Sequence, residues 1–277
     1  MTHKKLSGKI LFFSDIDETL VNTDKSLSQE NRLAVEEFLS RGNLFTISTG
    51  RALLGASNLL KKIGLYGKEG LLISSSNGAI VYDTFLEKEL LRRPVSPDLM
   101  VEAFDLAREF GIHIQTYTDT AVVSETDNEF LQRYLILQQL PVIFCENIRD
   151  AGIAPPPKLL CLDYASPEKI TGFRAFFTEK MQGRLDCFQS NPWLLEIVSP
   201  GVNKGSSLRF IAQHSSIPID HTISVGDAEN DLSMILEAGI GCAMINADEA
   251  LKAKADYVTQ NDNNHGGVAE ILHRFCL

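Results

Sequence analysis

The sequence predicts an α/β fold in which a parallel-sheet core is interrupted by a second, inserted α/β domain. Short, continuous apolar runs recur along the chain, and segments with helical periodicity lie between them. Such runs are typical of strands buried on both faces, as in parallel sheets, and their alternation with helices predicts an α/β architecture. The length of 277 residues exceeds what one hydrophobic core usually supports, which favours two domains.

Four apolar runs predict the strands of the core in chain order. They are residues 10–14 before Asp15, 44–49 before Gly50, 71–74 before Asn77 and Gly78, and 222–225 before Gly226 and Asp227. In open parallel sheets, ligands bind beyond the carboxyl ends of the strands. We therefore expect the polar residues around these strand ends to gather at one edge of the sheet.

Helical spacing and boundary residues complete the core. Ser28 can cap the first helix, and Gly42 marks its end. Apolar residues repeat at helical spacing again at 232–236 and 268–275. Because strands alternating with helices imply right-handed crossovers, the core is predicted to be Rossmann-like.

The middle of the chain predicts two related helix–strand units. Segments 96–98 and 166–168 each provide a Ser as the N-cap, a Pro at the first helical position and an acid, and Gly111 and Gly183 end the helices. A strand-like run follows each helix. The proline-rich segment 155–157 would join the two units.

These units are expected to form a cap domain at residues 84–190, and residues 1–83 and 191–277 would form the core. An insert after the third core strand would lie beside the site at the carboxyl ends of the strands. There it can exclude water and hold part of a ligand.

Composition and charge exclude several classes of function. The formal net charge of −10 repels phosphate backbones, so a nucleic-acid partner is not expected. No run approaches the roughly 18 apolar residues needed to cross a membrane, and the polar N-terminus does not resemble a signal peptide. The five cysteines lack C-x-x-C or zinc spacing and are expected to be free thiols, so we predict a cytoplasmic protein without a membrane partner. The sequence does not predict an oligomeric state.

The strongest chemical signal directly follows the first apolar run, in Asp15-Ile16-Asp17-Glu18-Thr19. Two carboxylates two positions apart concentrate negative charge, which a cation or a shared proton must offset. Hard oxygen ligands of this kind favour magnesium, and a carboxylate can also attack phosphorus to form an aspartyl phosphate. The alternative is a turn or helix-capping role for one of the two aspartates.

Three further segments carry candidate residues. Asp227 and Asp231 add two acids after another apolar run, although the helix dipole also favours acids in a first turn. Lys204 begins a helix, where it opposes the dipole unless an anion binds nearby; the alternative is a solvated lysine in a loop. The segment 49–51 offers the Thr49 hydroxyl and a close backbone approach to a phosphate oxygen, or is an ordinary strand-to-helix turn.

These four segments, in this order, resemble the haloacid dehalogenase superfamily of phosphohydrolases. The Asn77-Gly78-Ala79 triplet, segment 201–205 and the closing segment 265–269 resemble its Cof-type branch, which carries a large α/β cap after the third core strand. The resemblance covers essentially the whole chain. It implies a magnesium-dependent phosphatase of small phosphate monoesters, sugar phosphates or similar metabolites.

The resemblance also implies a role for each matching residue. Asp15 would be the nucleophile, and Asp17 the general acid for the leaving group and later the base for water. The magnesium ligands would be Asp15, the Asp17 carbonyl and Asp227, with support from Asp231. The phosphate or the rest of the substrate would be bound by Thr49, Gly50, Arg51, Asn77, Lys204 and Asn230, and Glu196 lies near the site in similar proteins.

One departure from the family pattern is Glu18, where similar proteins usually have Gly. Gly permits a positive φ and close backbone approach. We therefore expect Glu18 to restrict the turn or to place an extra negative charge near the leaving group.

Two other hypotheses stay open. A phosphotransferase or mutase would use the same phospho-aspartate but pass the phosphoryl group to a second substrate's hydroxyl. A non-enzymatic, receiver-like phospho-acceptor also groups acids, a Thr and a Lys around magnesium. Receivers are much shorter, however, and place the phosphorylated Asp at a later strand.

Overall fold

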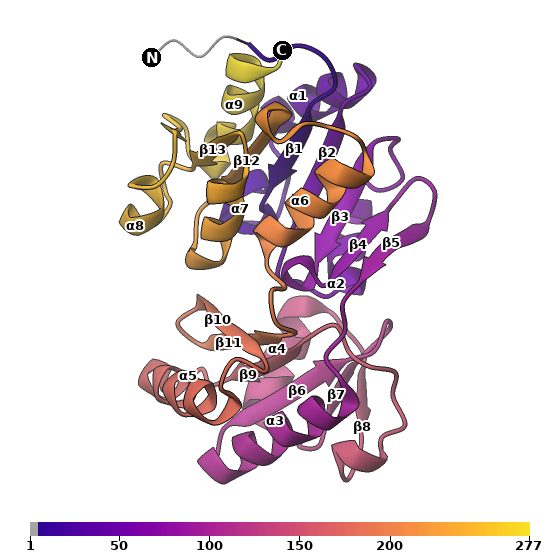
Figure 1. The fold of residues 1–277 in the computed structure, drawn as a ribbon, viewed down its shortest axis with the longest axis vertical. Helices are drawn as coiled ribbons and strands as arrows, with labels where there is room; N and C mark the ends of the chain where they lie inside the picture. Colours follow the sequence, from indigo (N-terminus) through magenta and orange to yellow (C-terminus); the bar gives the residue numbers. More distant parts are fainter. Residues whose placement is uncertain (1–4) are drawn as a thin grey trace. The chain divides into compact units, whose positions relative to one another are not determined.

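The computed structural model describes residues 5–277, which form two compact units (Figure 1). The first unit comprises the chain up to Thr49 together with Ala56–Leu91 and Asn203–Leu277. The second comprises Gly50–Gly55 and Arg92–Val202.

The first unit is built on a sheet whose strand order, within the described residues, is β14-β13-β12-β1-β2-β3-β4-β5. The strands are β1 (Leu11–Ser14), β2 (Leu44–Ser48), β3 (Leu71–Ser75), β4 (Ile80–Asp83), β5 (Lys88–Arg92), β12 (Thr222–Gly226), β13 (Ile240–Ala243) and β14 (Tyr257–Val258). From β14 to β3 all neighbours are parallel, and β4 runs antiparallel to β3. Since β1 pairs with both β12 and β2, the carboxyl ends of these three strands lie side by side.

Helices cover the two faces of this sheet (Figure 1). They are α1 (Gln29–Ser40), α2 (Leu53–Lys62), α6 (Lys204–His214), α7 (Leu232–Glu237), α8 (Glu249–Lys252) and α9 (Gly267–Phe275). Because side chains alternate along a strand, β1 serves two cores. Phe12 stacks on Phe45 of β2 at 5.1 Å between ring centroids and meets Phe38 of α1 edge-on at 6.0 Å. Phe13 points to the other face, where it packs in a cluster with Leu208 of α6.

Local signals set the ends of these elements. The Ser28 side chain accepts a hydrogen bond from the Asn31 amide at 3.1 Å, as an N-cap should, and Gly42 follows α1 with φ +80. The four predicted strands correspond to β1, β2, β3 and β12. The β4–β5 extension and the short strands β13 and β14 lie outside the four strands predicted from the sequence.

The second unit is built on another sheet, with the order β10-β11-β9-β6-β7-β8 in the described residues. Its strands are β6 (His113–Tyr117), β7 (Val122–Ser124), β8 (Val142–Phe144), β9 (Leu159–Leu162), β10 (Asp186–Asn191) and β11 (Leu194–Val198), and its helices are α3 (Pro97–Phe110), α4 (Glu129–Gln138) and α5 (Pro167–Met181). Its strand pairs are antiparallel except β7 with β8, which is parallel.

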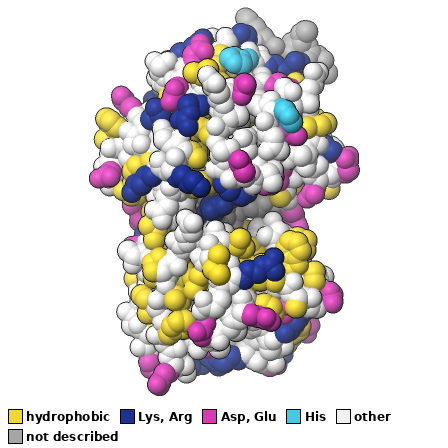
Figure 2. Space-filling view, turned by 180° about the vertical axis from the view of Figure 1, so that it is seen from behind, with side chains coloured by type: hydrophobic (Ala, Val, Ile, Leu, Met, Phe, Trp, Pro, Cys, Tyr) yellow, Lys and Arg dark blue, Asp and Glu magenta, His cyan; other side chains and the backbone are white. Residues whose placement is uncertain are grey.

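Two hydrophobic clusters fill the second unit. Phe104 of α3 packs with Phe173 and Phe177 of α5 in one, and Leu131 and Tyr134 of α4 pack in the other. Figure 2 shows that some hydrophobic side chains of this unit also lie on its surface. The large ones that are exposed are Ile136, Leu137, Ile143, Phe144 and Trp193.

The second unit differs in extent from the predicted cap at 84–190. Strands β4 and β5 continue the core sheet, so the unit begins at Arg92. Strand β11 pairs with β9 inside the second sheet, so the unit ends at Val202. The short segment Gly50–Gly55 also belongs to it, because Ala52 packs in the cluster of Leu131 and Tyr134.

Ser166 occupies the predicted N-cap position of α5, but its side chain does not cap the helix. Its hydroxyl instead donates to Glu168 Oε1 at 2.8 Å, and no amide of the helix donates to it. Ser96, its predicted counterpart, does accept from the Leu99 amide at 3.4 Å.

Among residues 5–277, no helix combines the length and the apolar character that a membrane crossing requires. The cytoplasmic location stays a prediction.

Candidate functional site

Three aspartates meet at the carboxyl ends of the two central strands of the first unit. Asp15 follows β1 and Asp227 follows β12, and the Asp15 amide donates to the Val225 carbonyl at 2.9 Å, which extends the strand pairing to the site. Asp231 lies one turn after Asp227. One carboxylate oxygen from each of Asp15, Asp227 and Asp231 lies within 4.8 Å of the others. The structure therefore brings together acids that are more than 200 residues apart in the chain.

Lys204 neutralises part of this charge from the first position of α6. Its Nζ lies 2.5 Å from Asp15 Oδ1 and 2.5 Å from Asp231 Oδ1, and its side chain is fully buried. Asn203 fixes the start of the helix, since its side chain accepts from the Ser206 amide at 2.8 Å and its own amide donates to Ser206 Oγ. The alternative of a solvated loop lysine is wrong. A buried ammonium requires charged partners, and the two carboxylates provide them.

Asp231 also shapes the turn that carries Asp227. Its Oδ2 accepts from the amides of Asp227 and Ala228 at 2.9 and 3.1 Å. A Cβ on Gly226 would lie 2.3 Å from Asp231 Cγ, so this position requires Gly. With one oxygen on Lys204 and the other on two amides, Asp231 is held as a fixed part of the site.

Asp15 and Asp227 bind protons more tightly than ordinary aspartates. Burial raises the pKa of Asp15 well above its usual value, the charges of Asp231, Asp227 and Asp17 raise it further, and Lys204 acts in the opposite direction. Burial and the charge of Asp231 raise the pKa of Asp227 to about 7, although the Thr19 hydroxyl, which donates to Asp227 Oδ1 at 2.8 Å, lowers it. One ammonium thus does not fully offset three acids.

The donor set fits a divalent cation. All three ligand candidates offer carboxylate oxygens close together, and the raised pKa values of Asp15 and Asp227 indicate that further positive charge would be stabilised there. The acidic group of Asp15, Asp227 and Asp231 can therefore hold such an ion.

Donors lie at the carboxyl ends of β2 and β3 in the same unit. The buried Thr49 accepts the Asn77 amide at its carbonyl at 2.9 Å, and Asn77 adopts φ +56. Asn230 Nδ2 donates to Asn77 Oδ1 at 3.2 Å, which leaves the amide group of Asn77 to serve as a donor. Within residues 5–277, this Asn77 Nδ2 is buried without a hydrogen-bond partner.

Several hydroxyls near these strand ends are also buried without a hydrogen-bond partner in the described residues. The buried side-chain oxygens without a partner in the described chain include Ser48 Oγ, Ser75 Oγ and Ser76 Oγ. Unsatisfied buried polar groups are rare in native proteins, so a group of them at one sheet edge indicates a place for a polar ligand. Gly78 brings this segment against the start of α6, because a Cβ there would lie 2.5 Å from the Asn203 carbonyl oxygen.

Asp17 lies beside the group of Asp15, Asp227 and Asp231, in the turn Ile16–Leu20. Its side chain is 34% exposed. Lys25 Nζ contacts Asp17 Oδ1 at 3.0 Å. Glu18 does not restrict this turn in the way one of the two expectations held. It adopts φ +55 and ψ 15, so the turn keeps the conformation that Gly would allow.

The predicted site residues divide between the two units. The first unit holds Asp15, Asp17, Thr49, Asn77, Lys204, Asp227, Asn230 and Asp231. Gly50, Arg51 and Glu196 belong to the second unit, where Lys158 Nζ donates to the Gly50 carbonyl at 2.6 Å and to Glu196 at 2.7 Å, and Arg51 donates to Gln138 at 3.2 Å. A role for these three in the same site stays a prediction.

Sequence reasoning missed two contributors to the site. Thr19 was part of the noted motif, but its bond to Asp227 joins residues 208 positions apart. Asn203 stands next to Lys204 in the noted segment 201–205, and a Ser three residues after it was the available sign of a reciprocal cap.

The family model of the haloacid dehalogenase-like hydrolases matches residues 12–272. The chain belongs to this family. This confirms the predicted family and, with it, the predicted fold class and the prediction of a hydrolase.

Named proteins of similar sequence and structure are consistent with that membership. The 5-amino-6-(5-phospho-D-ribitylamino)uracil phosphatase YcsE of Bacillus subtilis is 27% identical over 95% of this chain and 94% of its own. The chloroplastic endoribonuclease YBEY of Arabidopsis thaliana is 28% identical over 96% of this chain, which spans only 46% of that protein.

Two crystal structures share the fold over nearly their whole length. TM0651 from Thermotoga maritima is 31% identical, with a TM-score of 0.82 and 98% of both chains covered. A haloacid dehalogenase-like hydrolase from Bacteroides thetaiotaomicron is 27% identical, with a TM-score of 0.86 and coverage of 96% of this chain and 99% of that one.

Proposed function

We propose that this chain is a magnesium-dependent phosphatase that hydrolyses small organic phosphate monoesters through a phosphoryl group carried on Asp15. The observation that carries the proposal is the grouping of Asp15, Asp227 and Asp231 around the buried Lys204 at the carboxyl edge of the sheet. The named phosphatase among the relatives supports the same class of reaction.

In the first step, an Asp15 oxygen attacks the phosphorus of the ester. The bond from phosphorus to the leaving oxygen breaks, and Asp17 gives that oxygen a proton. In the second step Asp17 takes a proton from water, the water oxygen attacks the phosphorus, and the bond to Asp15 breaks to release inorganic phosphate. Phosphoryl transfer depends mainly on positioning and charge neutralisation.

Several residues of the first unit would hold the phosphate during these steps. Lys204 offers an ammonium beside Asp15, so it can stabilise charge on the transferring group. Thr49 and Asn77 can donate to phosphate oxygens, and the unpartnered Asn77 Nδ2 supports this role. Asn230 orients the Asn77 amide.

Magnesium would be held by the Asp15 and Asp227 carboxylates and the Asp17 carbonyl, with Asp231 supporting the site through Lys204 and the turn amides. When bound, the ion would supply positive charge that neutralises the phosphate and the acids. Its ligands are hard oxygens, which suit magnesium.

We infer that the substrates include phosphorylated sugars or related polyols. The support is the substrate in the name of YcsE, which carries a phosphate on a ribityl chain. The moderate acidity of the whole chain does not oppose this, because a small anion meets the local charge of Lys204 and the cation rather than the net charge.

The test is phosphate release from a panel of sugar, polyol and aryl phosphates, with and without magnesium. Wild-type protein should release phosphate only with the ion, and Asp15→Asn should release none while it stays folded. Asp163→Asn is a matched control, because Asp163 is an equally buried carboxylate in the second unit. Turnover in Asp15→Asn, or none in the wild type across the panel, would contradict the proposal.

A further inference from the structure

The segment from Ile16 to Ser26, after β1, contains two strained residues whose side chains meet. Glu18 and Lys25 both have a left-handed backbone, with φ of +55 and +65. Such a conformation costs on the order of 1 kcal/mol or more for a residue other than Gly, and it tends to persist where function requires it. Lys25 Nζ contacts Glu18 Oε1 at 3.1 Å and Asp17 Oδ1 at 3.0 Å.

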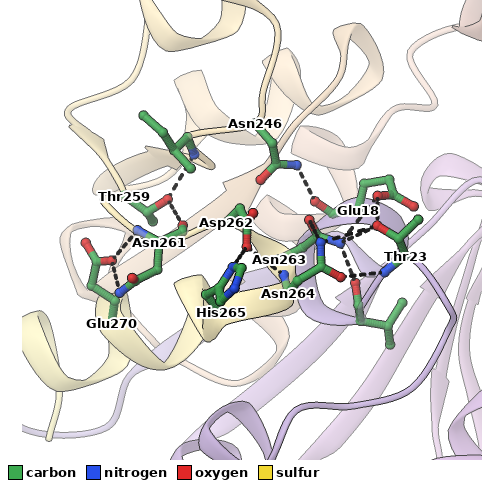
Figure 3. Close-up of polar contacts among 12 residues, drawn as sticks. Glu18, Thr23, Asn246, Thr259, Asn261, Asp262, Asn263, Asn264, His265 and Glu270 are labelled. Atoms are coloured by element: carbon green, nitrogen blue, oxygen red, sulfur yellow. Dashed lines mark hydrogen bonds and ion pairs between the residues drawn. The ribbon is translucent and has the colours of Figure 1, made fainter.

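The Glu18 carboxylate is held by groups from two other segments (Figure 3). Thr23 Oγ1 and Asn263 Nδ2 donate to Glu18 Oε2 at 2.9 and 3.3 Å. Asn246 Nδ2 donates to the Glu18 carbonyl at 2.9 Å, which fixes its backbone as well. The Glu18 side chain is therefore a fixed support and not a mobile surface acid.

The backbone of Lys25 is fixed in its own tight turn. Its amide donates to the Asn22 carbonyl at 2.8 Å, and the Asn22 amide donates to the Ser26 carbonyl at 2.9 Å. Asn264 Oδ1 accepts the Thr23 amide at 3.0 Å and ties this turn to the segment that holds Glu18. Both ends of the Glu18–Lys25 pair are thus anchored.

The ion pairs of Lys25 add little stability. The side chains of Lys25, Asp17 and Glu18 are 36%, 34% and 40% exposed, and ion pairs at such exposure contribute about 0–1 kcal/mol. That gain is no larger than the backbone strain of the two residues. The contact does affect orientation, because the anchored ammonium of Lys25 fixes the position of one oxygen of Asp17.

We propose that Lys25, held by Glu18, is a positioning residue that orients the carboxyl group of Asp17, which gives its proton to the leaving group. This rests on the proposed function, in which Asp17 is the acid. It also gives the Glu18 side chain a purpose: it holds the lysine that orients Asp17.

The test compares kcat/KM for two esters, 4-nitrophenyl phosphate and the primary-alkyl phosphate that the wild type hydrolyses best. The constant kcat/KM covers the steps up to departure of the leaving group. An alkoxide needs protonation, whereas 4-nitrophenolate leaves readily without it. Lys25→Met should lower kcat/KM about tenfold for the alkyl ester and at most about threefold for the aryl ester, since misaimed acids lose part of their effect.

Three variants make the result specific. Lys25→Arg keeps a cation and should restore most of the alkyl rate, and Glu18→Gly should shift the ratio of the two esters in the same direction as Lys25→Met. Lys68→Met is the matched control, because Lys68 pairs with Glu36 at 3.1 Å with nearly the same exposure, away from Asp17. Its ratio should not change.

Equal losses on both esters, or no rescue by Lys25→Arg, would overturn the positioning role. Should Lys25→Met fail to fold, Lys25→Arg and Glu18→Gly decide the question. A wild type that hydrolyses neither ester would reject the proposed function and this role with it. An active wild type with an unchanged ratio in the variants would reject the role of Lys25 alone.

Discussion

Two lysines of the first unit each lie between two carboxylates, but in opposite surroundings. Lys204 is fully buried between Asp15 and Asp231, whereas Lys25 is 36% exposed between Asp17 and Glu18. Charges interact strongly in a low-dielectric interior and weakly in water, where salt also screens them. The same chemical contact therefore fixes the architecture of the site in one place and can only orient a side chain in the other.

The two lysine contacts also differ in the sequence separation of the residues that they join. Lys204 meets Asp15 across 189 residues, so the contact depends on the complete core. Lys25 meets Asp17 across only eight residues, within one local segment of the chain. Removing the first contact should disturb the fold, and removing the second should disturb only Asp17.

The largest effect is expected from Lys204→Met. It leaves Asp15 and Asp231 buried without their cation, which should lower the free energy of unfolding by about 3–5 kcal/mol in metal-free protein at pH 7.5. Urea denaturation measures the change. Lys25→Met is the matched control and should lose about 1 kcal/mol or less. Equal losses in the two variants would contradict the contrast between them.

A smaller effect is expected from the pH dependence of the metal-free protein. The pKa of Asp227 is about 7 in the folded chain and 3.8 ordinarily, so between these values the folded state binds more protons than the unfolded state. The free energy of unfolding should therefore fall as pH rises through this window. The contribution of Asp227 is on the order of 2 kcal/mol between pH 5 and 7.5.

Asp227→Asn isolates this contribution, because it keeps the shape of the side chain and removes the titration. Urea denaturation in the presence of a chelator should show a weaker decline with pH in Asp227→Asn than in the wild type. When magnesium is present, the decline of the unfolding free energy with pH should differ less between the two proteins. Identical pH profiles without metal would show that Asp227 does not carry the raised pKa.

The smallest effect concerns the strain at Glu18. Glu18→Ala and Glu18→Gly both remove the side-chain contacts, but only Ala keeps a Cβ at φ +55. Glu18→Ala should therefore be less stable than Glu18→Gly by about 1 kcal/mol in urea denaturation. Equal stabilities would mean that the turn relaxes without cost.

Much of the core could be predicted because its strands are buried on both faces. The run that forms β1 leaves little choice but a central strand, and the acids after β1 and β12 could be expected to meet because those strands are parallel. The strand order of the second unit could not be predicted in this way. Strand β9 and helix α4 carry no boundary signal as strong as Ser96-Pro97, and their placement depends on pairing between distant segments.

The partners of individual site residues could not be predicted from the sequence either. Lys204 at a helix start suggested an anion, but nothing local shows that its ammonium is buried between Asp15 and Asp231. The positive φ of Glu18 likewise depends on Asn246 and Asn263, which lie more than 220 residues away. Local sequence indicates which groups reach the site, and long-range packing decides which atoms touch.

The central claim is that Asp15 carries the phosphoryl group, and the most direct measurement is to locate that group during turnover. The protein is mixed with magnesium and 4-nitrophenyl phosphate, whose leaving group needs no acid, so that Asp17→Asn can still form the phosphoryl enzyme. The mixture is quenched in acid within milliseconds and digested for mass spectrometry. We expect one phosphoryl group on the peptide that contains Asp15, more of it in Asp17→Asn, where attack by water is slowed, and none in Asp15→Asn. Turnover with the phosphoryl group on another residue, or with none on the protein in Asp17→Asn, would contradict it.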